Sequence, residues 1–456
     1  MIGKVPRQMI VRLSWTTGSY ALVQLLRLAN NVILARLLSP PLFGLMLIVN
    51  TIRTGVELLS DVGINQNIIS NPQGHDARFY DTAWTIKVIR GIFLATLCAA
   101  LARPLADFFD KPELASIFPV FALTFAFAGF QATASALLQK KQALGRISAV
   151  DVVVAAISLV AHVALALVTP TIWALIFGSL ITNAAALIST YLIIPGMRHR
   201  FVIDKASARE ILVFGKWIFV LSIIWFLAMN FDRLYFAKQI TLEMLGVYAI
   251  ARAMSDMLSN LAIRTSNLVL FPAVAAMEAS AGQVRSKLLR SRRTMVLLIA
   301  LGMAAFVAAS DLVIGILYDR RYATAAVILP LLLLGVWVSI LSTLNDSVML
   351  GTRRPAYPAI SNGAKLATLV VGVPLAFHYS GLLAAIVVLN IGEVVRYAVL
   401  WALSRRQHLG FGRDDLALTI VFLVGIVLFR EVLNAIGLTS GLTGLFPILE
   451  TGFTPR

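Results

Sequence analysis

The stretch IWALIFGSLITNAAALISTYLIIPGMRHR, residues 172–200, decides the class of fold. Residues 172–195 contain no Asp, Glu, Lys or Arg. A run of about 20 apolar residues is enough for one helix to cross the hydrocarbon core of a bilayer. Two arginines follow directly, as is typical where a helix leaves the membrane on the cytoplasmic side. The stretch therefore predicts a transmembrane helix with a basic cytoplasmic end.

Similar apolar runs recur along the whole chain. Only 13% of the residues are charged and 59% are hydrophobic, whereas a soluble domain carries about 25% charged residues. We expect thirteen spans, at 13–37, 42–68, 83–106, 114–138, 147–169, 172–195, 211–237, 243–270, 294–318, 325–350, 357–378, 381–403 and 416–436. The first twelve divide evenly around the basic loop 196–210. The sequence thus predicts an all-α integral membrane protein with two six-helix lobes, 1–199 and 200–404, and a segment 405–456 that holds the thirteenth span.

The loop charges predict the orientation. With the N-terminus in the cytoplasm, 21 of the 39 Lys and Arg residues fall in cytoplasmic segments and 6 in the opposite segments. Basic residues accumulate in cytoplasmic loops, and one missed span would invert the bias for everything after it. We therefore expect a multi-pass membrane protein with a cytoplasmic N-terminus. The thirteenth span would then place the C-terminal tail outside.

The basic cytoplasmic loops explain the net charge of +17. No zinc-finger, RNP or helix-turn-helix signature accompanies it, so nucleic-acid binding is not expected. One cysteine, Cys98, excludes a disulfide within the chain and a cysteine-ligated metal. The sequence has no GxxxxGK[ST] loop and no HExxH motif. We expect no metal, no cofactor and no enzymatic activity, and we interpret Asp414 and Asp415 as part of a solvated loop.

An internal repeat supports the two lobes. The segment ARLLSPPLFG, residues 35–44, recurs as AKQITLEMLG, residues 237–246, and in this alignment Asn30-Asn31 matches Asp232-Arg233. Six predicted spans separate the copies. Because six is even, both halves have the same orientation. A parallel repeat predicts lobes related by a pseudo-twofold axis along the membrane normal, with a substrate site between them.

Polar residues inside the spans follow helical spacing. A charge at a helix centre costs about 2.5–3.5 kcal/mol even on the mildest scale, so a polar stripe should face the interior of the bundle. The stripes are Gln24, Arg27 and Asn31 in the first span, Asn50, Arg53, Glu57 and Asp61 in the second, and Arg252, Asp256, Asn260 and Asn267 in the eighth. Arg53 and Arg252 lie within one turn of equivalent positions, and each precedes a carboxylate by four residues. We therefore expect both lobes to present Arg to a central cavity.

The candidate site joins these stripes to charges of other spans. The expected binding residues are Arg27, Asn31, Asn50, Arg53, Arg233, Arg252, Asn260, Lys365 and Arg396, supported by the carboxylates Glu57, Asp61, Asp232 and Asp256. The alternative for each is structural: a paired charge in the core, or a side chain that reaches the interface. We expect the side chains of Lys87, Arg90 and Lys216 to reach the membrane interface, and we expect His162 to be a core residue.

Several ordered motifs resemble the polysaccharide-transport (Wzx-type) flippases of the multidrug/oligosaccharidyl-lipid/polysaccharide exporter superfamily. The motifs are ILARLLSPPLFGLMLIVNTIRTGVELLSDVG at 33–63, NFDR at 230–233, LGVYAIA at 245–251 and GLLAA at 381–385. The resemblance implies a twelve-helix transporter that moves a polyprenyl-diphosphate-linked oligosaccharide by alternating access. The thirteenth span departs from that pattern.

Arginine suits this cargo because its guanidinium makes bidentate bonds to phosphate oxygens. The expected partners are the lipid-linked oligosaccharide, membrane lipids, and a polysaccharide polymerase with its chain-length machinery. Three alternatives remain open. These are a multidrug exporter of the same superfamily, a lipid II flippase, and a membrane glycan polymerase or ligase. The last usually needs a large outer loop, and the loops here are short.

Overall fold

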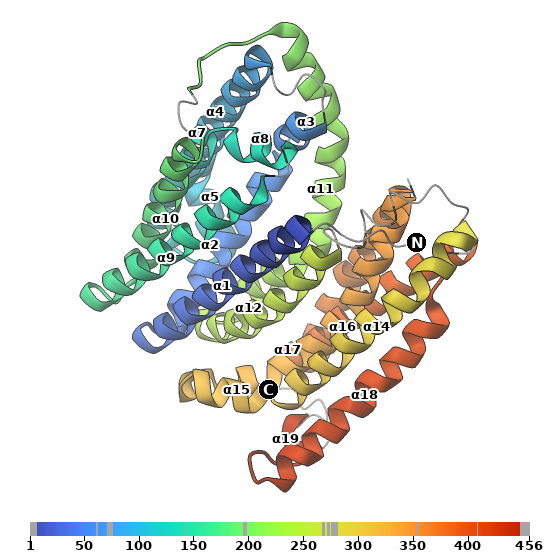
Figure 1. The fold of residues 1–456 in the computed structure, drawn as a ribbon. Helices are drawn as coiled ribbons and strands as arrows, with labels where there is room; N and C mark the ends of the chain where they lie inside the picture. Colours follow the sequence, from blue (N-terminus) through green and yellow to red (C-terminus); the bar gives the residue numbers. More distant parts are fainter. Residues whose placement is uncertain are drawn as a thin grey trace. The chain divides into compact units, whose positions relative to one another are not determined.

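The computed structural model describes residues 7–60, 63–70, 76–141, 143–194, 198–266, 270, 274, 281–352, 354–407 and 409–446. Every regular element in these ranges is helical (Figure 1), which confirms the all-α class. The elements are α1 (Arg7–Leu37), α2 (Pro40–Leu59), α3 (Ile64–Ser70), α4 (Ala77–Ala100), α5 (Ala102–Phe109), α6 (Leu114–Phe121), α7 (Leu123–Phe130), α8 (Ala134–Lys140), α9 (Leu144–Val168), α10 (Ile172–Leu192), α11 (Lys205–Gln239), α12 (Leu242–Thr265), α14 (Ala281–Ala308), α15 (Ser310–Leu317), the short 3₁₀ turn η3 (Arg320–Tyr322), α16 (Ala325–Gly351), α17 (Ala356–Arg405), α18 (Gly412–Ala435) and α19 (Leu442–Leu445).

Most expected spans coincide with helices that are long and apolar enough to cross a bilayer. Among the described residues there are seven such helices, or up to nine if each of two bent pairs is one span. The helix α17 holds two expected spans. Its 50 residues would extend about 75 Å if straight, which is far longer than one crossing of the bilayer needs. It breaks at Gly381, whose φ of 72° suits glycine and few other residues. The protein is therefore a multi-pass membrane protein.

Four expected spans are interrupted, which the hydrophobic pattern did not predict; one of them, 83–106, breaks at Leu101 between α4 and α5. The expected span 42–68 ends as a helix at Leu59 and resumes as α3 at Ile64. The span 114–138 bends by 46° between α7 and α8, and the span 294–318 bends by 58° between α14 and α15. An interrupted helix leaves main-chain N–H and C=O groups without helical partners, and hydrocarbon cannot satisfy them.

The chain folds as two compact units. Unit 1 comprises Met1–Ile223 and Ala237–Leu242, and unit 2 comprises Ile224–Phe236 and Glu243–Arg456. In unit 1, α9 packs against α1 and α10, and α4 packs against α7; in unit 2, α16 packs against α17 and α14 against α18. The thirteenth expected span is thus the helix α18, a candidate membrane span in unit 2. The expected lobe boundary at 199/200 stays a prediction.

The connections at the two repeat copies have the same length and register. Helix α1 ends at Leu37 and α2 begins at Pro40, while α11 ends at Gln239 and α12 begins at Leu242. Each connection therefore has two residues, and each stands at the matched position of the repeat alignment. Proline at the start of α2 fits this short turn, because a first-turn residue needs no helical N–H partner.

Candidate functional site

Two consecutive helices of unit 2, α11 and α12, bring four charges together. Arg252 on α12 places its Nε 3.3 Å from Asp232 Oδ2 and 3.5 Å from Asp256 Oδ1. Arg233 on α11 donates to Asp256, and Tyr248 donates to Asp232. The adjacent residues Asp232 and Arg233 point to different partners, as expected for neighbours on a helix. Arg252 and Asp256 of the expected eighth-span stripe thus lie together, and Arg252 and the neighbouring Arg233 are both paired with carboxylates.

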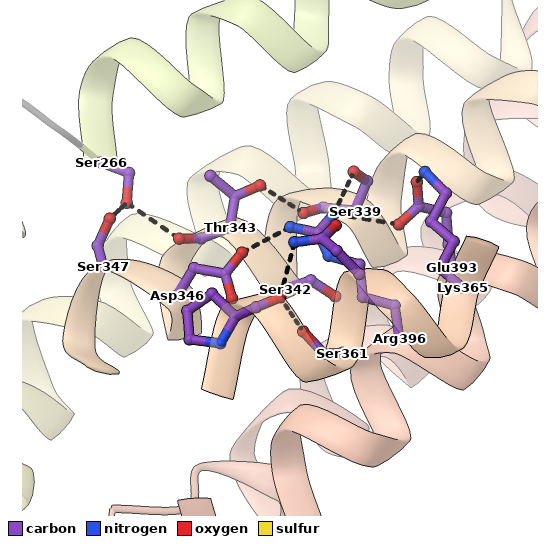
Figure 2. A network of polar contacts seen from close by, with 12 residues as sticks. Ser266, Ser339, Ser342, Thr343, Asp346, Ser347, Ser361, Lys365, Glu393 and Arg396 are labelled. Atoms are coloured by element: carbon purple, nitrogen blue, oxygen red, sulfur yellow. Dashed lines mark hydrogen bonds and ion pairs between the residues drawn. The ribbon is translucent and has the colours of Figure 1, made fainter. Parts of the chain in front are cut away.

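A second charged group lies on α16 and α17 of the same unit. Lys365 Nζ lies 2.6 Å from Glu393 Oε1, and Arg396 lies 2.6 Å from Asp346 and 3.3 Å from Glu393. Figure 2 shows Arg396 between Asp346 on one side and Glu393 with Lys365 on the other. The fold brings Lys365 and Glu393 together by turning α17 back on itself at Gly381.

Hydroxyl groups of α16 continue this network. Arg396 Nη1 donates to Ser339 Oγ over 3.5 Å, and Ser266 Oγ of unit 2 donates to Ser347 Oγ over 2.7 Å. Figure 2 shows Ser339, Thr343 and Ser347 along one stretch of α16, with Ser266 reaching Ser347 from another part of the chain. The sequence analysis missed Asp346, although an Asp inside an apolar run is itself the signal that could have found it.

The unit 1 site is simpler and more exposed. Arg53 Nε donates to Glu57 Oε1 over 3.0 Å, and Arg53 Nη2 donates to Asn183 Oδ1 of α10 over 3.2 Å. Its guanidinium also lies 6.0 Å from the ring centre of Phe121. The side chains of Arg53 and Glu57 are 26% and 36% exposed, compared with 4% for Arg396. A guanidinium with exposed surface can contact a ligand without unfolding its surroundings.

Basic side chains of α4 and α8 donate to main-chain oxygens near the interruptions in unit 1. Arg90 Nη2 donates to the main-chain oxygen of Glu57 over 2.5 Å, near the end of α2. Lys87 Nζ donates to the main-chain oxygen of Gln131 over 3.2 Å, just after α7, and Lys140 donates to that of Ile68 over 3.3 Å. Cations near a helix C-terminus stabilise its unpaired carbonyls. Lys87 and Arg90 therefore contact main-chain oxygens at helix ends, and the expectation that they reach the membrane interface stays a prediction.

The remaining candidates are placed individually. Arg27, Asn50 and Asn260 are exposed, and Asn31 is partly buried. Within the described part of the chain, the Asn31 side-chain oxygen has no hydrogen-bond donor. Asp61 and Asn267 lie outside the described residues, as does the side chain of Lys216. His162 is a core residue, with its Nδ1 2.8 Å from the Ser158 main-chain oxygen.

Two buried ion pairs attach α18 to its neighbours, and both were missed. Arg292 Nη1 donates to Asp415 Oδ1 over 2.6 Å, with both side chains 1% exposed. Arg430, fully buried, donates to both oxygens of Asp311 over 2.8 Å and to the main-chain oxygen of Ala308 at the α14–α15 bend. The interpretation of Asp415 as a solvated residue is therefore wrong. Its partner Arg292 lies 123 residues away along the chain, so the local sequence next to Asp414 gives no sign of the pair.

The charge groups of unit 2 combine basic and acidic side chains in equal number. Within the described ranges no group of three or more His, Cys, Asp or Glu side chains could hold a metal ion. The two charge groups of unit 2 contain four basic and four acidic side chains: Arg233, Arg252, Lys365, Arg396, Asp232, Asp256, Asp346 and Glu393. Buried charges are tolerated only when such pairing offsets desolvation.

Solved structures with this fold are membrane transporters. The chain is similar to the lipid II flippase MurJ in an inward closed conformation, with a TM-score of 0.75 and 11% identity over 95% of each chain. It is also similar to an inward-facing multidrug resistance MATE family transporter of the MOP superfamily, with a TM-score of 0.65 and 13% identity over 87% of this chain and 95% of that one. A MOP superfamily transporter from Pyrococcus furiosus gives a TM-score of 0.57 at 16% identity, over 90% of this chain and 96% of that one. The protein has the fold of the MOP superfamily transporters.

The sequence comparisons give the family. Residues 33–347 match the family described as polysaccharide biosynthesis protein, and the chain belongs to that family. The lipopolysaccharide biosynthesis protein WzxC of Escherichia coli is 24% identical over 272 residues, which are 59% of this chain and 55% of that protein. The match therefore spans about half the length of this relative. Both results confirm the Wzx-type resemblance of the motifs.

Proposed function

We propose that the protein is a flippase that moves a polyprenyl-diphosphate-linked oligosaccharide across the bacterial inner membrane, outward, for polysaccharide biosynthesis. The observation that carries the proposal is the family match over residues 33–347. The related protein of Escherichia coli is named for lipopolysaccharide biosynthesis, and MurJ is named a lipid II flippase. Transport by alternating access would need no catalytic residue.

The physical problem is the polar head group of the cargo. Each unpaired hydroxyl costs several kcal/mol in hydrocarbon, and each phosphate charge costs more. The polyprenyl chain is apolar and can stay in the lipid. A protein that moves such a molecule must supply fixed donors to the diphosphate, and the planar guanidinium of arginine supplies two at once.

Exposure decides which of the candidate cations can contact the cargo. Arg53 is 26% exposed, and Arg233 and Arg252 are each 18% exposed. Lys365 and Arg396 are only 6% and 4% exposed and are paired with carboxylates. We propose that Arg53 contacts the diphosphate, with Glu57 and Asn183 orienting its side chain, and that Arg252, Arg233 and the exposed Arg27 assist. Lys365 and Arg396 then hold unit 2 together.

The alternatives make different demands on the site. A multidrug exporter for cations would favour unpaired carboxylates, but in unit 2 the four carboxylates described above are all paired with basic side chains. A lipid II flippase would handle the same diphosphate with another sugar, so only the cargo separates it from the proposal. A glycan polymerase or ligase would leave unpolymerised units on the outer leaflet when it is deleted.

Deletion of the gene tests the role. We expect one surface or secreted polysaccharide to be lost while its lipid-linked repeat units accumulate on the cytoplasmic leaflet. Protection of these units from an added periplasmic glycosidase would locate them. Accumulation on the outer leaflet would favour the polymerase alternative, and a cell-wall precursor in place of the repeat unit would favour the lipid II alternative.

A further inference from the structure

The segment 198–204, which precedes α11 (Figure 1), is hydrogen-bonded to side chains of α4 in unit 1. The main-chain N–H of Val202 donates to Thr85 Oγ1 over 3.1 Å, and that of Asp204 donates to Thr82 Oγ1 over 3.0 Å. Between these bonds and α10 lies His199, with a side chain that is 1% exposed. The imidazole is therefore fully enclosed although its segment is not helical.

The partners of His199 fix its protonation state. Its Nδ1 lies 3.1 Å from Asp81 Oδ1, and its Nε2 accepts from the main-chain N–H of Thr133 over 3.3 Å. A carboxylate only accepts and an amide N–H only donates, so Nδ1 must carry the proton and Nε2 must be bare. The geometry requires the neutral imidazole. A second proton on Nε2 would face the Thr133 N–H, and that hydrogen bond would be lost.

Thr133 belongs to the interruption between α7 and α8, where the fourth expected span bends by 46°. Lys87 donates to the main-chain oxygen of Gln131 there, and two further main-chain groups are satisfied by hydroxyl side chains. Ala132 N–H donates to Thr190 over 3.0 Å, and the Phe130 oxygen accepts from Tyr191 over 2.8 Å. His199 therefore joins two non-helical segments, 131–133 and 198–204, through one titratable group.

We propose that His199 is a pH-sensitive latch that closes the segment 198–204 onto the α7–α8 interruption when neutral and releases it when protonated. This inference is independent of the cargo and of the flippase proposal. It assigns the latch to unit 1 alone, just before α11 begins at Lys205. Release would free the start of α11 from the α7–α8 interruption.

The groups around the imidazole set the direction of its titration. Helix α4 presents Tyr80, Asp81 and Lys87 to the His199 imidazole. Trp84 of the same helix stacks on the imidazole with ring centres 5.1 Å apart. Tyr191 of α10 contacts its edge. Burial lowers the pKa of His199, the hydrogen bond and charge of Asp81 raise it in part, and Lys87 lowers it again. Because the folded-state pKa is depressed, the latch is fully formed above the ordinary pKa of about 6.5 and opens as pH falls through the lowered value.

A spin label on the segment tests the latch in the full-length protein in lipid nanodiscs. The buried Cys98 is replaced by Ser, and Arg200, which is exposed, is replaced by Cys and labelled with a nitroxide. Between about pH 7.5 and about pH 5 we expect the mobile component of the spectrum to grow, with a midpoint below about 6.5. His199→Gln should show no transition, because the amide stays neutral and can still donate and accept.

Two further variants sharpen the result. Asp81→Asn should lower the midpoint by roughly one pH unit or more, because it removes the carboxylate that favours the cation. His199→Lys should be mobile at every pH, and His378→Gln, at an exposed histidine, should keep the transition. A spectrum of the parent protein that is unchanged down to about pH 5, or a transition that survives in His199→Gln, would overturn the latch.

Discussion

The two units carry the same sequence pattern but give it different surroundings. On α2 of unit 1, Arg53 and Glu57 form one pair that is about a quarter to a third exposed. On α12 of unit 2, Arg252 and Asp256 enter a larger set of charges that extends to Asp232 and Arg233. An arginine four residues before a carboxylate therefore predicts a pair, and its surroundings determine whether the pair is open to a ligand or part of the core.

We therefore expect the destabilisation caused by removing one charge to increase with the burial of its pair. An exposed pair contributes little, about 0–1 kcal/mol, because solvent or polar groups replace the lost partner. A buried charge without its partner costs about 3–5 kcal/mol. Loss of abundance should therefore increase from Arg53 through Arg252 to Arg396, which is the reverse of the order we expect for contact with the cargo.

The largest effect is expected for Arg396→Ala. Removing this guanidinium leaves Asp346 without its 2.6 Å partner and Glu393 with Lys365 alone. We expect about 3–5 kcal/mol of destabilisation and a severe loss of protein from the membrane fraction. Thermal unfolding in detergent and quantitative blotting measure it. Arg321→Ala, which removes the exposed pair with Asp319, is the matched control and should be close to wild type. Equal losses in the two variants would contradict this dependence on burial.

A double substitution should cost less than a single one at the Lys365–Glu393 pair. Glu393→Leu leaves both Lys365 and Arg396 with one carboxylate fewer, whereas Lys365→Met leaves Glu393 with Arg396 only. Replacing a whole buried pair by apolar groups is often neutral, while breaking it is not. We expect Lys365→Met combined with Glu393→Leu to recover at least about 1 kcal/mol relative to Glu393→Leu alone. Additive losses in the cycle would mean that the pair has no coupling.

An intermediate effect is expected for Arg252→Ala, and the smallest for Arg53→Ala. Arg252 is 18% exposed and borders Asp232, which is 4% exposed, so its loss uncovers a buried carboxylate. The abundance of Arg252→Ala should fall two- to threefold, and that of Arg53→Ala should stay within about 1 kcal/mol of wild-type stability. Blotting of both variants at equal expression compares them. Lower abundance of Arg53→Ala than of Arg252→Ala would reverse the roles of the two units.

The α18 attachment offers a further comparison inside unit 2. Arg430 fastens α18 to the α14–α15 bend through Asp311, and Arg292 fastens it to Asp415. Exchange of the charges, Arg430→Asp with Asp311→Arg, should restore part of the abundance that either single variant loses. Quantitative blotting of the three variants checks it. No recovery in the double variant would mean that the carbonyl of Ala308, the third partner of Arg430, dominates.

The all-α membrane class could be predicted because bilayer thickness imposes a minimum apolar length. The number of thirteen spans stays a prediction, since the described residues hold seven candidate spans, or up to nine. The repeat predicted that the loop after the first span matches the loop after the seventh, and both connections have two residues, 38–39 and 240–241. The end of α2 at Leu59 and the interruption at 131–133 could not be predicted in this way. Hydropathy averages over a window, so a break of a few residues remains apolar on average even though the helix ends there.

The residue types of the site were predicted better than their partners. Arg53 with Glu57 and Arg252 with Asp256 follow from helical spacing, which the sequence contains. Asp346 with Arg396 and Asp415 with Arg292 depend on which helices meet, at separations of 50 and 123 residues. Local periodicity carries no information about such contacts, so the burial of Asp415 could only come from the fold.

The export activity of Arg53 variants, normalised to membrane abundance, tests whether Arg53 contacts the diphosphate. Arg53→Ala should reach the membrane at nearly wild-type levels yet lose polysaccharide export. Arg53→Lys should restore only part of the export, because lysine keeps the charge without the fork geometry. Arg53→Ala with unchanged export per molecule would contradict the assignment of Arg53 to the diphosphate.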